Sequence, residues 1–123
     1  PHAAWLAQMP GLLIGGEVAL ILAAGFCGLH PMIGAALILS LANSVHGGIA
    51  AAVLANVVVL GWALSSTVAI WSMPVPLAAK LFDIPLRRLA LGRNARFVAI
   101  FGPCACVALA GLNWVLMHWG RAP

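Results

Sequence analysis

Apolar residues dominate the chain and fall into runs separated by short polar or Gly- and Pro-containing positions. The first run covers residues 11–27, the second about 31–44 and the third about 49–64. The last run, residues 97–118, contains no Asp, Glu, Lys or Arg. Because a helix needs about 20 apolar residues to cross a bilayer, the pattern predicts one final full-length transmembrane helix preceded by shorter ones.

The second and third runs are both too short for a comfortable crossing, and residues 45–48 form a small polar turn between them. Two such helices indicate either a re-entrant hairpin or two strongly kinked crossings, and the sequence leaves both open. Ahead of the second run, Gly28 suits the end of one helix and Pro31 the first turn of the next. A tight turn is therefore expected between them.

Residues 65–76 combine hydroxyl side chains with two prolines directly behind an apolar run. Pro74 and Pro76 lack an amide hydrogen and disfavour helix in the residue before them. Irregular backbone at membrane depth is tolerated only against protein or a water-filled cavity. We therefore expect an unwound segment here, followed by a half-helix over residues 77–82.

The hydroxyls of this segment are the first candidate ligands for a substrate or ion. They belong to Ser65, Ser66, Thr67 and Ser72. The alternative is that they donate hydrogen bonds to helical carbonyls, a common use of Ser and Thr in membrane helices.

Basic residues concentrate in one predicted loop, residues 80–96, where Asp83 is the only acid. They are Lys80, Arg87, Arg88, Arg93 and Arg96. By the positive-inside rule this loop is cytoplasmic, and binding of anionic lipid head groups is a plausible second role. The final helix would then carry the C-terminus to the opposite side of the membrane.

The composition supports the membrane interpretation. Of the 123 residues, 64% are hydrophobic and 7% charged, whereas a soluble domain carries about 25% charged residues. We therefore predict an all-α, polytopic integral membrane protein that forms a single transmembrane unit over residues 1–123, with the bacterial inner membrane as its expected location. The net charge of +4 comes from one loop, not from a basic face, and gives no sign of a nucleic-acid partner.

Three further polar residues are candidate ligands. Glu17 interrupts the first run, and because a carboxylate at membrane depth costs about 2.5–3.5 kcal/mol, it would face a cavity or a partner as a proton or cation site. The alternative, which the sequence favours, is that the helix begins near Glu17 and leaves it at the interface. His46 lies at the tip of the proposed hairpin, where a substrate could approach. Asn56 lies within the third run, where its amide could contact a ligand or bond across helices.

No sequence feature indicates an enzyme. A nucleophile with a nearby base, paired carboxylates and a phosphate-binding glycine loop are all lacking. The histidines have no helical i, i+3 or i+4 pairing, and Cys104 and Cys106 point in different directions on a helix. Neither a metal nor a cofactor is therefore expected.

Two motifs carry a resemblance to a known family. Residues 28–31 read Gly-Leu-His-Pro, and residues 61–67 read Gly-Trp-Ala-Leu-Ser-Ser-Thr, followed by Ser72 and a helix that ends at residues 81–85. Their order over roughly residues 17–118 resembles the C-terminal region of permeases in the ion transporter superfamily, which contains arsenite, citrate and dicarboxylate carriers. The Ser-Asn-Thr hairpin-tip motifs of the family are not present as such.

The resemblance implies a longer protein with two inverted repeats, in which substrate and coupling cation meet near the bilayer midplane. The chain would be part of a secondary transporter for a small anion or metabolite, coupled to a cation, with lipids and the remaining transporter as partners. The alternative is a small structural or accessory subunit that packs against a larger membrane complex and carries no chemistry.

Overall fold

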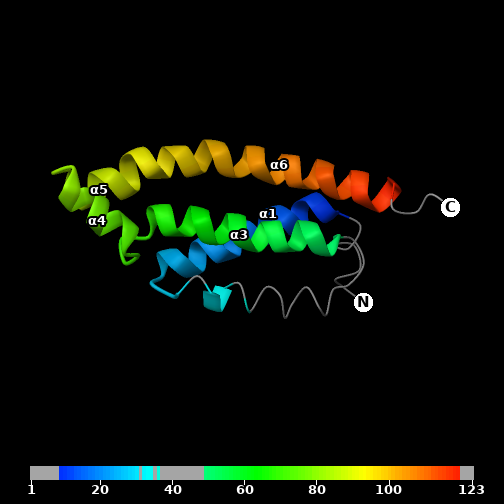
Figure 1. Cartoon of the computed structure of the whole chain (residues 1–123), viewed down its shortest axis with the longest axis horizontal. Helices are drawn as coiled ribbons and strands as arrows, with labels where there is room; N and C mark the ends of the chain where they lie inside the picture. Colours follow the sequence, from blue (N-terminus) through cyan, green and yellow to red (C-terminus); the bar gives the residue numbers. More distant parts are fainter. Residues whose placement is uncertain (1–8, 31, 35, 37–48, 120–123) are drawn as a thin grey trace.

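The computed structural model describes residues 9–30, 32–34, 36 and 49–119, and every regular element within them is helical. The all-α class is thereby confirmed. The elements are α1 (Pro10–Phe26), α3 (Ala51–Val68), α4 (Pro74–Leu81), α5 (Leu86–Arg88), the π-helical segment η2 (Leu89–Asn94) and α6 (Ala95–Trp119) (Figure 1). The short helix expected over residues 31–44 and the hairpin tip at His46 fall largely outside the described residues.

Three long helices form an elongated bundle in which α1 and α3 run parallel and α6 runs antiparallel to both (Figure 1). Between α1 and α3, Gly61 lies against Ile21 and Ser65 lies against Gly25, so the two helices run in the same direction. Along α3 and α6 the order is reversed, since Leu64 lies against Gly102 while Ala50 is bonded to Asn113.

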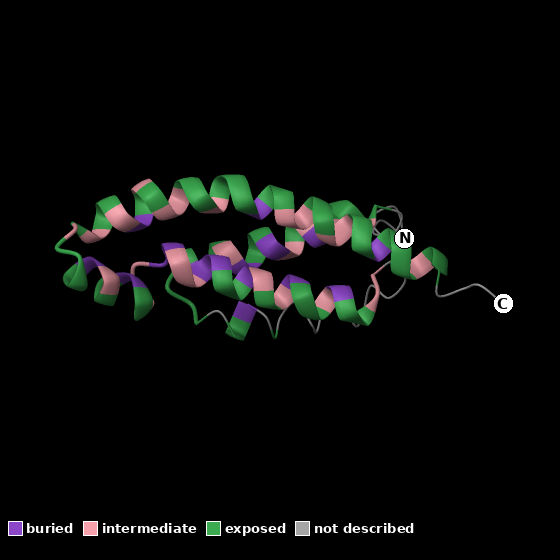
Figure 2. Ribbon diagram, turned by 45° about the horizontal axis from the view of Figure 1, so that its top comes forward, coloured by how far each residue is buried: buried purple, intermediate pink, exposed green. Residues whose placement is uncertain are grey.

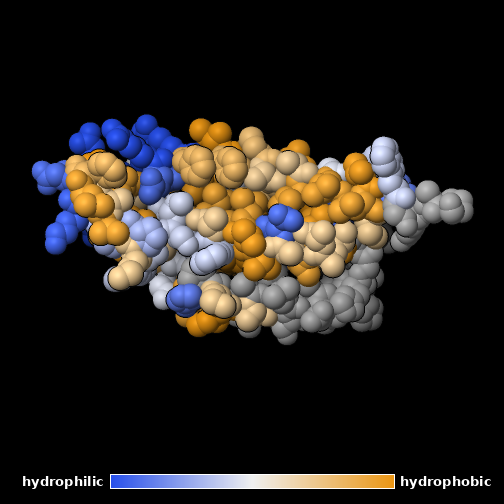
Figure 3. Space-filling view, viewed as in Figure 1, coloured by the Kyte–Doolittle hydropathy of each residue, from blue (hydrophilic) through white to orange (hydrophobic). Residues whose placement is uncertain are grey.

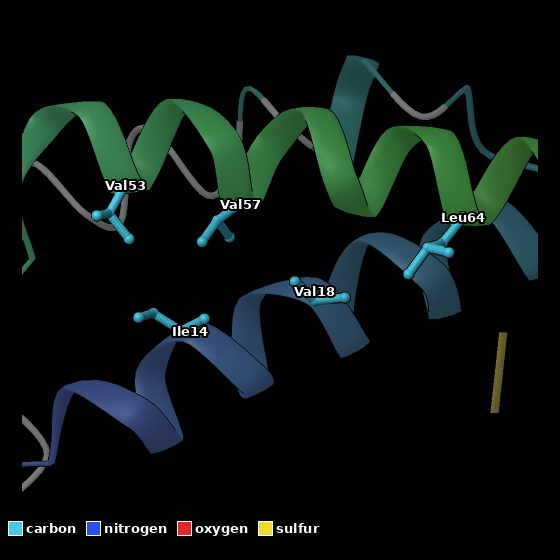
Figure 4. Close-up of a cluster of buried hydrophobic side chains, with 5 residues drawn as sticks. All are labelled: Ile14, Val18, Val53, Val57 and Leu64. Atoms are coloured by element: carbon cyan, nitrogen blue, oxygen red, sulfur yellow. The ribbon is translucent and has the colours of Figure 1, made fainter. Parts of the chain in front are cut away.

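The core is a line of aliphatic side chains between α1 and α3. Its buried members, Ile14, Val18, Val53, Val57 and Leu64, recur at helical spacing and project toward one another (Figure 4). Their spacing of four or seven residues places them on one face of each helix. Because two glycines lie in the same interface, the helices approach closely at its end, which is the usual way in which membrane helices gain packing energy.

Two helices end in the same capping motif. At the end of α1, Leu29 N–H donates to the Ala24 carbonyl at 3.0 Å, and Gly28 has a φ of +82°. At the end of α4, Ile84 N–H donates to the Ala79 carbonyl at 3.0 Å, with a φ of 50° at Asp83. Both are the bond from C″ to C3 that closes a Schellman motif. Glycine takes this left-handed conformation freely, and Asp is among the few other residues that tolerate it.

The prediction of a basic loop over residues 80–96 is wrong for most of these residues, because they are helical. The chain turns at residues 82–85 and is then helical from Leu86 to Trp119. After Pro85, Leu, Arg and Ala are good helix formers, and no further proline occurs before Pro103. A 34-residue helix is about 51 Å long, against about 30 Å of hydrocarbon, so its basic end can extend beyond a bilayer.

The unwound segment is also shorter than expected. α3 remains helical through Ser65, Ser66 and Thr67 and ends at Val68, and α4 begins at Pro74, so the break covers residues 69–73. Pro74 occupies the first position of α4, where the missing amide hydrogen costs nothing. The prolines therefore start a helix instead of prolonging the break.

Two described helices, Ala51–Val68 and Leu86–Trp119, are long and apolar enough to cross a membrane. In the second, only 6% of the most apolar window is buried inside the structure, and its outer surface is exposed along most of its length (Figure 2). The core helix of a soluble protein would instead be mostly buried. These two helices support, at this coarse level, the predicted membrane protein.

Candidate functional site

Three of the four predicted hydroxyl ligands are bonded to the backbone of their own segment. Ser66 donates to the carbonyl four residues earlier at 2.8 Å, and Thr67 to the carbonyl three residues earlier at 2.7 Å. The Ser72 hydroxyl lies 2.7 Å from the carbonyls of both Ser66 and Ala69, so its one proton is shared between them. These hydroxyls stabilise the last turn of α3 and the break after it, as the alternative interpretation expects.

The fourth hydroxyl, that of Ser65, faces α1. Ser65 is 0% exposed, and its Oγ has no hydrogen-bond partner in residues 9–30, 32–34, 36 and 49–119. A Cβ on Gly25 would overlap this oxygen, so the absence of a side chain at Gly25 is what makes room for it. Ser65 therefore fills the α1–α3 contact and is not grouped with the other three hydroxyls.

The break lies at the basic end of the bundle. The side-chain amide of Asn94 donates to the Thr67 carbonyl at 2.6 Å. This bond places the end of α3 at the same height as Arg93 and Arg96, the neighbours of Asn94 in the chain. The break is therefore near the end of the bundle and not at its middle, where the resemblance places a binding segment.

Asn94 was missed by the sequence analysis, and it replaces a hydrogen bond that α3 loses where it ends. Asn94→Leu removes the amide while keeping a similar volume. We expect the free energy of unfolding in mixed micelles to fall by about 1 kcal/mol, in the range of inter-helical bonds in membrane proteins. Asn94→Gln would retain part of the stability if the bond is the cause, whereas equal loss in both variants would point to packing.

Asn56 does not line a site. It is exposed on α3, and its Nδ2 donates to the Ala52 carbonyl of its own helix at 2.8 Å. His46 lies outside the described residues. Of the predicted ligand residues that the structure describes, only Ser66, Thr67 and Ser72 lie together.

Glu17 lies well inside α1, so the favoured interpretation of Glu17 as a first-turn residue is wrong. The helix begins at Pro10, which puts Glu17 about 10 Å along it and within a residue of its midpoint. The reason is that Pro10 suits the first position of a helix. Residues 11–16 are apolar or glycine, so the helix can continue from Pro10 without a break.

The carboxyl group of Glu17 is half-buried, and its Oε2 is buried with no hydrogen-bond partner among the residues that the structure describes. Glu17 is one turn before Ile21, which contacts Gly61, so it lies at the height of the middle of α3. A carboxyl group at this position is costly as an anion unless a proton or cation neutralises it.

Asn113, on α6, is the second side-chain amide that the sequence analysis missed, after Asn94 on η2. It is 1% exposed, and its Oδ1 accepts the backbone N–H of Ala50 at 2.8 Å, directly before α3 begins. A lone Asn inside the most apolar run was the available signal. Asn94 and Asn113 are about 28 Å apart along the continuous helix Leu86–Trp119, so this helix is bonded to both ends of α3.

The five basic side chains are exposed, as expected of a surface segment. They gather at the end of the molecule that holds α4 and α5, while the surface beyond them is largely apolar (Figure 3). They are Lys80, Arg87, Arg88, Arg93 and Arg96.

No protein-family model, curated protein or solved structure matches the chain. The residues of the chain that bear most directly on function are therefore Glu17 and the five basic residues at one end of the bundle.

Proposed function

We propose that this chain is part of a cation-coupled secondary transporter for a small anion or metabolite, in which Glu17 binds the coupling proton or cation. The observation that supports this most directly is the buried carboxyl oxygen of Glu17, which lies at mid-height in an apolar bundle and has no partner within the described part of the chain. Ionisable residues at such depth usually mark ion or proton pathways because their burial is otherwise costly.

The basic end indicates the orientation. With Lys80 and the arginines on the cytoplasmic side, α1, α3 and α6 cross the bacterial inner membrane and the C-terminus lies on the opposite side. Glu17 then lies near the bilayer midplane, the depth at which secondary transporters bind their coupling ions. This placement agrees with the resemblance to permeases of the ion transporter superfamily, although it moves the candidate ion site from the Ser-Ser-Thr stretch to α1.

The proposed role needs Glu17 to alternate between two forms. As a carboxylate it would bind a proton or a small cation from one side of the membrane. The carboxylate and its bound ion are then neutral together, so the free energy needed to move them through apolar surroundings is lower. The hydroxyls of Ser66, Thr67 and Ser72 would hold the break in shape, and groups outside this chain would contribute to substrate binding.

The second candidate is a structural subunit without chemistry. It is favoured by the three hydroxyls that are satisfied by backbone carbonyls and by the broad apolar surface of α6. In this case Glu17 would stay protonated and inert at every pH at which the protein is stable.

Chemical labelling of Glu17 separates the two candidates. A membrane-soluble carbodiimide reacts with protonated carboxyl groups, and the chain has two acids, Glu17 and Asp83. For the full-length protein in native membranes, we expect labelling at Glu17 that declines as pH rises or as the coupling cation is added. Asp83, exposed beyond α4, is the internal comparison, and Glu17→Gln should abolish the labelling at residue 17.

If neither a change of pH nor added Na⁺ alters the labelling of Glu17, the ion-binding role is contradicted and the structural subunit is favoured. A transport assay on proteoliposomes completes the test. Glu17→Gln should abolish cation-driven uptake while the protein still inserts and unfolds at the same denaturant concentration as wild type.

A further inference from the structure

The segment between α3 and α6 combines exposed apolar side chains with unpaired positive charge. We call residues 71–88 the elbow. α4, its longest helix, buries only Val75 and Ala79 against the bundle. Its outer side and flanks leave five large apolar side chains 59–88% exposed: Trp71, Met73, Leu77, Leu81 and Phe82. In water this apolar surface would be unfavourable.

The charges of the elbow lie beside this apolar surface. Lys80, Arg87 and Arg88 are exposed, and no ion pair joins them to an acid in the part of the chain that the structure describes. Asp83 is the only acid in the elbow, and the exposed Arg93 follows on η2, the next element of the chain. The elbow therefore offers several cations without a counter-ion.

We infer that the elbow is a binding site for anionic phospholipid at the cytoplasmic surface of the membrane. Arg87 and Arg88 would contact the phosphate, for which the planar guanidinium is well suited. Trp71, Leu77 and Phe82 would lie among the glycerol and upper acyl carbons, where amphipathic segments with Trp and Phe settle. The inference rests on the membrane embedding in the proposed function, but not on transport.

The pairing of the two surfaces favours a lipid over other anions. A free phosphate would use the arginines and leave the five apolar side chains in water. A nucleic acid would need an extended basic face, whereas the cations here are confined to one end of the bundle. An anionic phospholipid satisfies both surfaces at once, and a zwitterionic lipid satisfies the apolar one alone.

Trp71 can report which lipid is bound. The protein has five tryptophans, so replacing Trp5, Trp62, Trp114 and Trp119 with Phe leaves Trp71 as the sole emitter. The full-length protein is reconstituted with phosphatidylglycerol and phosphatidylcholine at equal mole fractions, with bromine on the acyl chains of one lipid or the other. Bromine quenches Trp71 in proportion to the local fraction of the lipid that carries it.

We expect brominated phosphatidylglycerol to quench Trp71 more strongly. The apparent affinity for phosphatidylglycerol should be about fivefold that for phosphatidylcholine, which is the ratio expected when one arginine interacts with the anionic head group. Arg87→Gln with Arg88→Gln should bring the ratio close to one, while Arg87→Lys with Arg88→Lys should keep most of it. Should the four Phe replacements prevent folding, co-purification of phosphatidylglycerol with wild type and with the Gln variant replaces the quenching.

Equal quenching by both lipids in wild type would overturn the inference and leave the transport proposal untouched. Loss of the preference on addition of inorganic phosphate would also overturn it, because the ligand would then be a free anion. No quenching by either lipid would contradict the membrane placement of the elbow and, with it, the orientation in the proposed function.

Discussion

Gly61→Leu is expected to separate α1 from α3. It should destabilise the protein more than the loss of the side-chain amide of Asn94 or of Asn113, each of which bonds to an end of α3. A Cβ at residue 61 would lie 2.5 Å from Ile21 Cδ1 and 3.0 Å from Ile21 Cβ. The second distance cannot be relieved by rotating the Ile21 side chain, so the helix backbones must move apart. Overpacking of this kind costs about 3 kcal/mol, and unfolding in mixed micelles would measure it.

Ala55→Leu is the matched control for this prediction. Residue 55 lies on the same helix but is exposed, so the added side chain meets lipid and should change stability by less than about 0.5 kcal/mol. A double-mutant cycle identifies the contact. Ile21→Ala removes the atoms beyond Cβ, and Gly61→Leu should cost less in that background than in wild type. Equal costs in the two backgrounds would mean that α1 and α3 do not meet at this point.

The glycine pattern shows which part of the packing can be predicted from sequence. By sequence alone, the places that favour close helix contact are the pairs Gly15-Gly16 and Gly47-Gly48, together with Gly102. In the structure a Cβ at residue 15 or 16 would meet no atom within 4 Å, and one at residue 102 would make an ordinary contact with Leu64. Gly47 and Gly48 lie outside the described residues, and the close approaches within them are at Gly25 and Gly61. Composition indicates that glycines pack helices, but which face is turned inward depends on long-range pairing.

The break after α3 was predicted from the right residues with the wrong extent. Two prolines and several hydroxyls do mark it, because proline restricts the residue before it. The local pattern could not show that Ser66 and Thr67 bond to their own helix or that Asn94 reaches back from the start of the long helix. The last bond joins residues 27 positions apart, and no local rule identifies such a partner.

Glu17 illustrates the opposite case, where the residue was identified and its environment was misjudged. A lone acid in an apolar run is visible in the sequence, but its depth depends on where the helix begins. The sequence interpretation placed the start at Glu17, whereas Pro10 starts the helix about two turns earlier. The changed depth matters for function because an interfacial carboxylate needs no partner, whereas one at mid-height does.

Asn113→Leu is expected to lower the free energy of unfolding by about 2 kcal/mol, because it leaves the Ala50 N–H at the start of α3 without its acceptor. The first amide groups of a helix have no partner within it, and Asn113 is buried at 1% exposure. Asn56→Leu makes the same chemical change at an exposed site whose amide bonds only within its own helix. It should leave stability within about 0.5 kcal/mol of wild type or increase it, since a lipid-facing amide is replaced by an apolar group. If the two variants lose similar amounts of unfolding free energy, the bond between Asn113 and Ala50 is not the cause of the effect. The replacement of an Asn by Leu would then be destabilising wherever it is made.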